Sequence, residues 1–176
     1  FASTFTQLAD KEIDGYTFET KTTAGSVANL RLISDGYIDL AIVQADLLSD
    51  AYNATGTFAD KKYQKGYKAV ASLYTECCQI VVRKDSGITG IDDLINKTVS
   101  VGASESGSEK NAEQILKMSG ITDELINKVN MDYTEAAEKL KAGEIDAFFC
   151  TAGTRTEVIG QLSKECDICL ISLDDK

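Results

Sequence analysis

The chain has 176 residues, of which 43% are hydrophobic and 26% charged, a composition typical of a folded globular protein. Its formal net charge of −10 repels phosphate backbones, so nucleic-acid binding is not expected. It contains no histidine, which excludes catalytic sites that need an imidazole base and zinc sites of the HExxH type.

The first part of the chain alternates helical and strand-like patterns. Ser26 is a suitable N-cap for an amphipathic helix, and Gly36 follows that helix as a stop. The apolar run that comes next, IDLAIV, is typical of a strand buried in a parallel sheet. The expected elements are helices over 3–13, 26–34 and 46–52, and strands over 17–22, 38–43 and 69–74.

The second part continues the alternation of strands and helices. Strands are expected over 77–83, 98–101, 129–132, 145–150 and 168–173, and helices over 91–95, 109–118, 135–141 and 156–163. Regular alternation of the two element types along a chain is typical of mostly parallel sheets flanked by helices. The sequence therefore predicts the α/β class.

A weak internal repeat indicates two related halves. The run GYID at residues 36–39 matches GEID at 143–146, an offset of 143 − 36 = 107 residues, and each run follows an amphipathic helix. We therefore predict two lobes, residues 1–78 and 79–176. The strand over 98–101 and its glycine-serine loop would have their counterpart before residue 1. The first lobe is thus expected to be incomplete and the chain to be a fragment of a longer receptor.

The strongest chemical signal is the loop Gly102 to Ser108, which lies between a predicted strand and a predicted helix. A helix start presents unpaired backbone N–H groups and the positive end of the helix dipole, which suits a carboxylate or phosphate. The P-loop pattern is not met, because Ser108 stands where the lysine belongs. The alternative is a polar turn with an N-cap serine. The candidate ligand-binding residues here are Ser104, Ser106, Gly107 and Ser108.

A second helix start and several strand ends carry further small polar groups. Ligands of open α/β sheets bind outside the carboxyl ends of strands, so we expect a cleft between two such edges. Arg155 is a candidate partner for a ligand carboxylate, or else a solvated rim residue, and Tyr74 packs either on the ligand or in the core. The remaining candidates are Thr23, Gly25, Ser26, Asn29, Gln44, Asp46, Thr151 and Thr154.

The five cysteines do not form a metal site. Cys77 and Cys78 are interpreted as small core residues of a strand, because free cysteine is often buried. Cys166 and Cys169 form a lone CxxC, which cannot complete a tetrahedral zinc site, although a disulfide between them stays open. No metal or cofactor is expected.

The run TAGSVANLRL at 23–32 resembles the TGGSVENLRLL-type segment of the TAXI family, the solute receptors of TRAP transporters. Matches to the same family continue in order along nearly the whole chain. They are GYIDLAIVQAD at 36–46, ASLY at 71–74, VVRKDSGI at 81–88, VSVG at 99–102, SGSE at 106–109, IDAFF at 145–149 and AG at 152–153. The family's first strand and C-terminal elements have no counterpart here.

The resemblance implies a type 2 periplasmic-binding-protein fold, in which two lobes close on a ligand without catalysis. It implies a small carboxylate such as glutamate or 2-oxoglutarate as the solute, a TRAP membrane permease as the partner, and an extracytoplasmic location, periplasmic or as a cell-surface lipoprotein. Two alternatives remain from the residues: an effector-binding sensory domain of a larger regulator, and a small α/β enzyme that uses Cys150 or Glu105.

Overall fold

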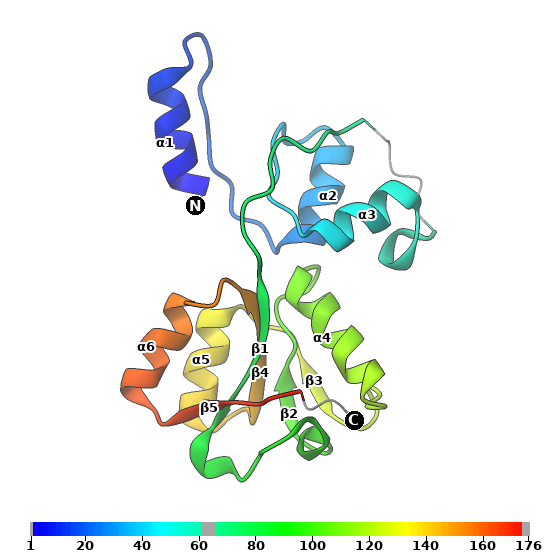
Figure 1. The fold of residues 1–176 in the computed structure, drawn as a ribbon, viewed down its shortest axis with the longest axis vertical. Coiled ribbons are helices and arrows are strands. Elements are labelled where there is room, and N and C mark those ends of the chain that lie inside the picture. The colour runs from blue at the N-terminus through cyan, green and yellow to red at the C-terminus, as the bar shows by residue number, and fades with distance from the viewer. Residues whose placement is uncertain (1, 61–65, 174–176) are drawn as a thin grey trace.

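The computed structural model describes residues 2–60 and 66–173. Figure 1 shows two bodies of structure, which we call the helical lobe (residues 26–60) and the sheet lobe (residues 77–173). The first helix, α1 (Ala2–Glu12), stands apart from both of them.

The sheet lobe is built on one five-stranded sheet in the order β3-β2-β4-β1-β5. Strand β2 runs parallel to β3 and β4, whereas β1 runs antiparallel to β4 and β5, so four strands share one direction. The predicted α/β class with a mostly parallel sheet is therefore confirmed. The strands are β1 (Cys77–Arg83), β2 (Thr98–Ser100), β3 (Asn127–Val129), β4 (Ala147–Ala152) and β5 (Ile168–Leu170).

Helices cover both faces of this sheet because the two central strands are apolar on both sides. On one face Ile80 and Phe149 pack with Leu116 of α4 (Gly107–Met118). On the other face Phe148 packs with helices α5 (Tyr133–Ala142) and α6 (Glu157–Glu165). All of these core side chains are almost completely buried. The remaining helical turns are 3₁₀ helices at Lys84–Ser86 and Ile91–Leu94.

The helical lobe has a small core of its own. Val27 and Leu30 of α2 (Ser26–Ser34) pack against Leu47 of α3 (Ala45–Asn53) and against Phe58 of a 3₁₀ turn (Gly56–Phe58). Phe58 is completely buried. Two helices and a turn therefore supply the core of this lobe.

The three strands expected in the first half of the chain are not formed. Residues 17–22, 38–43 and 69–74 have no regular secondary structure, and none pairs with another described segment. A strand depends on hydrogen bonds and side-chain pairs across a ladder, so these segments cannot form one without a partner strand. Leu40 and Val70 are accordingly 52% and 85% exposed.

The repeated GYID/GEID motif marks two equivalent helix ends. After α2 the N–H of Gly36 donates to Ile33 O. The N–H of the next residue, Tyr37, donates to Leu32 O. After α5 the N–H of Gly143 donates to Leu140 O in the same way, and the N–H of Glu144 donates to Lys139 O. Both ends are Schellman motifs closed by a glycine with φ near 75°, at 76° and 74°.

Other differences from the predicted elements are small and fall at element ends. Strand β4 begins two residues later than expected, at Ala147, and β3 lies at 127–129 instead of 129–132. The helix expected over 91–95 is a 3₁₀ helix. All five cysteines are free, so the CxxC of Cys166 and Cys169 is not a disulfide.

Candidate functional site

Two segments that the sequence predicts to bind anions meet where the lobes face each other. The N–H groups of Val27 and Ala28, in the first turn of α2, donate to the carbonyl oxygen of Glu105 at 3.2 and 3.3 Å. Figure 1 shows the starts of α2 and α4 at the junction of the two lobes. We call residues 23–29 together with residues 102–108 the facing rim.

The helical-lobe side of this rim is built around Gly25 and Ser26. Gly25 is the N-cap of α2 and supplies no capping side chain. A Cβ atom on Gly25 would lie 3.0 Å from the Cα of Ser106, so the two segments are in contact. The hydroxyl oxygen of Ser26 accepts a hydrogen bond from the N–H of Gln44 at 3.0 Å. Because a serine hydroxyl also carries one proton, that proton remains to be donated.

The sheet-lobe side presents a second serine, Ser106, whose hydroxyl also accepts one hydrogen bond from a backbone N–H. Ser106 is the N-cap of α4, and its hydroxyl oxygen accepts from the N–H of Glu109 at 3.1 Å. Capping is therefore observed, but the hydroxyl proton of Ser106 is again not used by that bond. The facing rim thus has two serines with a donor to spare, Ser26 and Ser106, one from each lobe.

Ser108 differs because its hydroxyl is used completely within the sheet lobe. Its oxygen accepts from the N–H of Thr151 at 3.0 Å and contacts the hydroxyl of Tyr133. The Tyr133 hydroxyl donates to the carbonyl oxygen of Thr151 at 3.0 Å, so the Ser108 proton must be donated to the Tyr133 oxygen. Ser108 therefore ties the start of α4 to the end of β4 and has no free donor.

Tyr133 is a site residue that sequence reasoning missed. Its position after the N-cap Asp132 marks only a helix start, and nothing local indicates the contact with Ser108, 25 residues away. Burial raises the pKa of Tyr133 to about 12, so its hydroxyl stays protonated and keeps donating.

Replacing Tyr133 with phenylalanine should destabilise the sheet lobe by about 1–3 kcal/mol, because Ser108 and the Thr151 carbonyl lose a buried partner. Urea unfolding followed by circular dichroism measures the effect. Tyr16→Phe is the control, because Tyr16 is 71% exposed and should change the unfolding free energy little. A Tyr133→Phe variant as stable as its parent would contradict the network.

A polar cluster beside the rim links both lobes through Gln44. Its Nε2 donates to Glu76 Oε2 at 2.7 Å and to Asn111 Oδ1 at 3.3 Å, and Asn111 Nδ2 donates to Asp46 Oδ2 at 3.5 Å. A Cβ on Gly107 would lie 2.1 Å from Gln44 Oε1, so the glycine makes room for this amide. Neither Glu76 nor Asn111 was among the predicted ligand-binding residues, although Glu76 lies just after the strand expected over 69–74.

The other predicted residues divide into two groups. Thr23 Oγ1 donates to Asn29 Oδ1 at 2.6 Å, and Asn29 Nδ2 donates to Ile42 O at 2.8 Å, so this pair shapes the rim from within the helical lobe. The second group is solvent-exposed and is not brought into these contacts: Tyr74, Ser104, Thr154 and Arg155.

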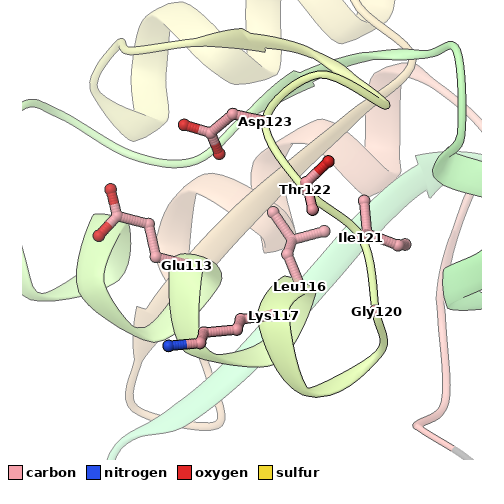
Figure 2. Close-up of a pocket in the computed structure, with 7 residues that line it drawn as sticks. All are labelled: Glu113, Leu116, Lys117, Gly120, Ile121, Thr122 and Asp123. Carbon is pink, nitrogen blue, oxygen red and sulfur yellow. The ribbon is translucent and has the colours of Figure 1, made fainter.

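A separate cavity of about 400 Å³ lies at the other end of α4, away from the rim. Figure 2 shows its wall, in which Leu116 lies near the chain that follows the helix, with Glu113 and Lys117 on the helix beside it. Lys128 forms ion pairs with Glu113 and Asp123 at 3.5 and 2.6 Å, so these carboxylates are neutralised. The lining residues are Glu113, Leu116, Lys117, Gly120, Ile121, Thr122 and Asp123.

Neither a metal site nor a membrane-spanning helix is found in the part of the chain that the structure describes. No group of three or more histidine, cysteine, aspartate or glutamate side chains there could hold a metal ion. Within the same residues no helix combines the length and apolar character that crossing a membrane requires.

Comparison with known proteins gives a family and a fold. The model of the NMT1-like family matches residues 3–176. Among solved structures, the periplasmic aliphatic sulphonate binding protein SsuA from Escherichia coli is 16% identical, with a TM-score of 0.58, over 97% of this chain and 54% of its own. The alkanesulfonate-binding protein SsuA from Xanthomonas axonopodis pv. citri, bound to MOPS, is also 16% identical, with a TM-score of 0.62. This likeness covers 97% of this chain and 55% of that protein.

An ancestral arginine-binding protein bound to arginine is 22% identical, with a TM-score of 0.60, over 96% of this chain and 66% of its own. At these identities the likeness concerns the fold, which is that of periplasmic binding proteins, as the sequence predicted. This chain spans about half the length of the two sulfonate-binding structures.

Proposed function

This chain belongs to the NMT1-like family, and we propose that it is the solute-binding part of an extracytoplasmic receptor, which holds a small anionic solute between its two lobes. One observation carries the proposal. The starts of α2 and α4 meet across the lobes, and each brings a serine hydroxyl with an unused proton, from Ser26 and Ser106. Helix starts and hydroxyl donors are the groups that bind anionic oxygens.

Binding energies favour a site that needs both lobes. A micromolar dissociation constant corresponds to about −8 kcal/mol. A hydrogen bond to a charged group contributes roughly 1.5–3 kcal/mol, and a helix terminus about 0.3–1 kcal/mol. Since association itself costs several kcal/mol, four or five such contacts are needed. One lobe offers too few, so we propose that closure of residues 1–78 on 79–176 completes the site.

The proposed solute, membrane partner and family group follow from the resemblance of the sequence to the TAXI family. We propose a small carboxylate of the glutamate or 2-oxoglutarate type as the solute, TRAP permease subunits as the membrane partner, and membership of the TAXI group. The structural neighbours support the proposal of a solute-binding protein, because they are binding proteins for sulfonates and for arginine. Sulfonates and carboxylates both present the anionic oxygens that this rim would bind.

An enzyme based on Cys150 is a poorer explanation of the structure. The Cys150 side chain is completely buried, and burial raises its pKa to about 11. The thiol therefore stays protonated at neutral pH, although the thiolate is the nucleophile. Glu105, the other enzymatic candidate, is paired with Arg31 at 2.8 Å.

Native mass spectrometry of the purified protein should reveal a co-purified anion. Calorimetric titration with glutamate, 2-oxoglutarate and a short alkanesulfonate then separates the carboxylate from the sulfonate class. Binding of a carboxylate with at least tenfold preference supports the finer proposal, and preference for the sulfonate overturns it. Failure of every small anion to bind would overturn the receptor proposal itself.

Replacing both Ser26 and Ser106 with alanine should weaken binding of the co-purified solute about a hundredfold or more, since two hydrogen bonds to a charged group are lost. Titration calorimetry measures the change. Ser163→Ala is the control, because that hydroxyl donates to Gly160 O on the exposed face of α6. Unchanged affinity in a folded double variant would show that the rim is not the site.

A further inference from the structure

Glu105 reaches from the sheet lobe onto the helical lobe with both its backbone and its side chain. Its carbonyl oxygen accepts from the N–H groups of Val27 and Ala28 at 3.2 and 3.3 Å. Its carboxylate Oε2 accepts from Arg31 Nη2 at 2.8 Å, one turn further along the same helix. A single residue therefore makes three polar contacts across the junction of the lobes.

The helix that receives these contacts has no cap of its own. Its N-cap is Gly25, without a side chain, and no capping hydrogen bond is formed there from within the helical lobe. The first N–H groups of a helix need an acceptor from outside the helix. In this structure Glu105 supplies that acceptor to two of them.

The loop holds Glu105 in a conformation that turns its carbonyl toward α2. Its φ is +63°, in the left-handed region that residues other than glycine seldom adopt. The N–H of Glu105 donates to Glu109 Oε2 at 2.9 Å, and the N–H of Ser106 donates to Ala103 O at 3.1 Å. The strained conformation is thus held by bonds within the sheet lobe in addition to its contacts with the helical lobe.

We infer that Glu105 is a latch that holds the two lobes together without a ligand, by occupying the start of α2 and pairing with Arg31. It places an oxygen acceptor where an anionic oxygen would otherwise bind, and a negative charge beside it. One consequence rests on the proposed function: an anion that binds at the start of α2 must displace the Glu105 carbonyl. The latch itself needs no ligand and can be tested in the unliganded protein.

Amide hydrogen exchange measured by NMR reports the latch directly. In the unliganded protein the amides of Val27 and Ala28 should exchange more slowly than unbonded amides do. Glu105→Gln removes the ion pair but keeps the carbonyl, and should speed exchange at both amides about two- to fivefold, as expected for a half-exposed pair. Arg31→Gln, which removes the other partner of the ion pair, should speed exchange at both amides by the same factor. The amide of Leu30, inside α2, should be unaffected.

The matched control is Glu165→Gln, which breaks the Lys141–Glu165 pair. That pair has a distance of 2.7 Å and side chains 39% and 36% exposed, against 2.8 Å, 42% and 41% for Arg31–Glu105. It lies within the sheet lobe and should leave Val27 and Ala28 unchanged. Unprotected Val27 and Ala28 amides in the parent protein, or no response to either latch variant, would overturn the inference. A response without binding of any anion would leave the latch standing and the receptor proposal refuted.

Discussion

Replacing Gly25 with alanine is expected to force the two sides of the rim apart and to weaken binding of the co-purified solute roughly tenfold or more, which is about 1.4 kcal/mol. The new Cβ would lie 3.0 Å from Ser106 Cα and 3.1 Å from Ser106 Cβ, closer than normal carbon contacts. The obstacle is backbone, which cannot rotate away. Gly25 also has φ 137° and ψ −154°, a region that is essentially restricted to glycine.

Calorimetric titration of this variant needs a control that separates backbone strain from lost contact. Gly15→Ala serves, because Gly15 also has a positive φ, 82°, but a Cβ there would meet nothing within 4 Å. The control should bind the solute like the parent protein. Equal affinities of the Gly25→Ala variant and the parent would mean that the solute does not need the two sides of the rim in contact.

Replacing Gly102 with alanine is expected to destabilise the sheet lobe by about 2–6 kcal/mol. Strain at its φ of +103° costs about 1–3 kcal/mol, and overpacking adds a similar amount. The added Cβ would lie 2.8 Å from Ser108 Cβ and 3.0 Å from Ser106 Oγ. The loop that presents Ser106 to the other lobe therefore depends on a residue without a side chain.

Gly120→Ala is the control that separates the steric contact of a new Cβ from the strain of a positive φ. Gly120 has φ +74° and open space around the position of a Cβ, so its replacement should cost only about 1–2 kcal/mol. Both variants are compared by urea unfolding. If Gly102→Ala were no less stable than Gly120→Ala, the close packing of the loop against the start of α4 would be wrong.

The sequence predicted the sheet lobe well because its signals are local and agree with one another. Strand β1 has the predicted bounds and helix α4 ends at the predicted residue, since an apolar run and an amphipathic stretch define them locally. The same signals failed at residues 38–43. An apolar run predicts burial, but it forms a strand only where a partner strand is hydrogen-bonded to it, and that partner is not a property of the run itself.

The candidate site divides in a similar way. The N-cap Ser106 could be predicted, because a small polar residue before an amphipathic stretch is a local pattern. The predicted N-cap Ser26 is wrong by one residue, since Gly25 is the N-cap of α2 and Ser26 is its first helical residue. The use of the Ser26 and Ser108 hydroxyls could not be predicted, since their partners Gln44 and Tyr133 come from distant parts of the chain. For the same reason Glu105 was considered as a catalytic carboxylate, whereas its carbonyl and charge contact the opposite lobe.

In the proposed function, both sides of the rim hold one anion together. Two-dimensional ¹⁵N–¹H spectra recorded while the co-purified solute is added test it most directly. We predict that the amide signals of residues 26–28 and of residues 106–108 shift together and saturate at the same solute concentration. Shifts confined to one of these two segments, or absent from both, would contradict the claim.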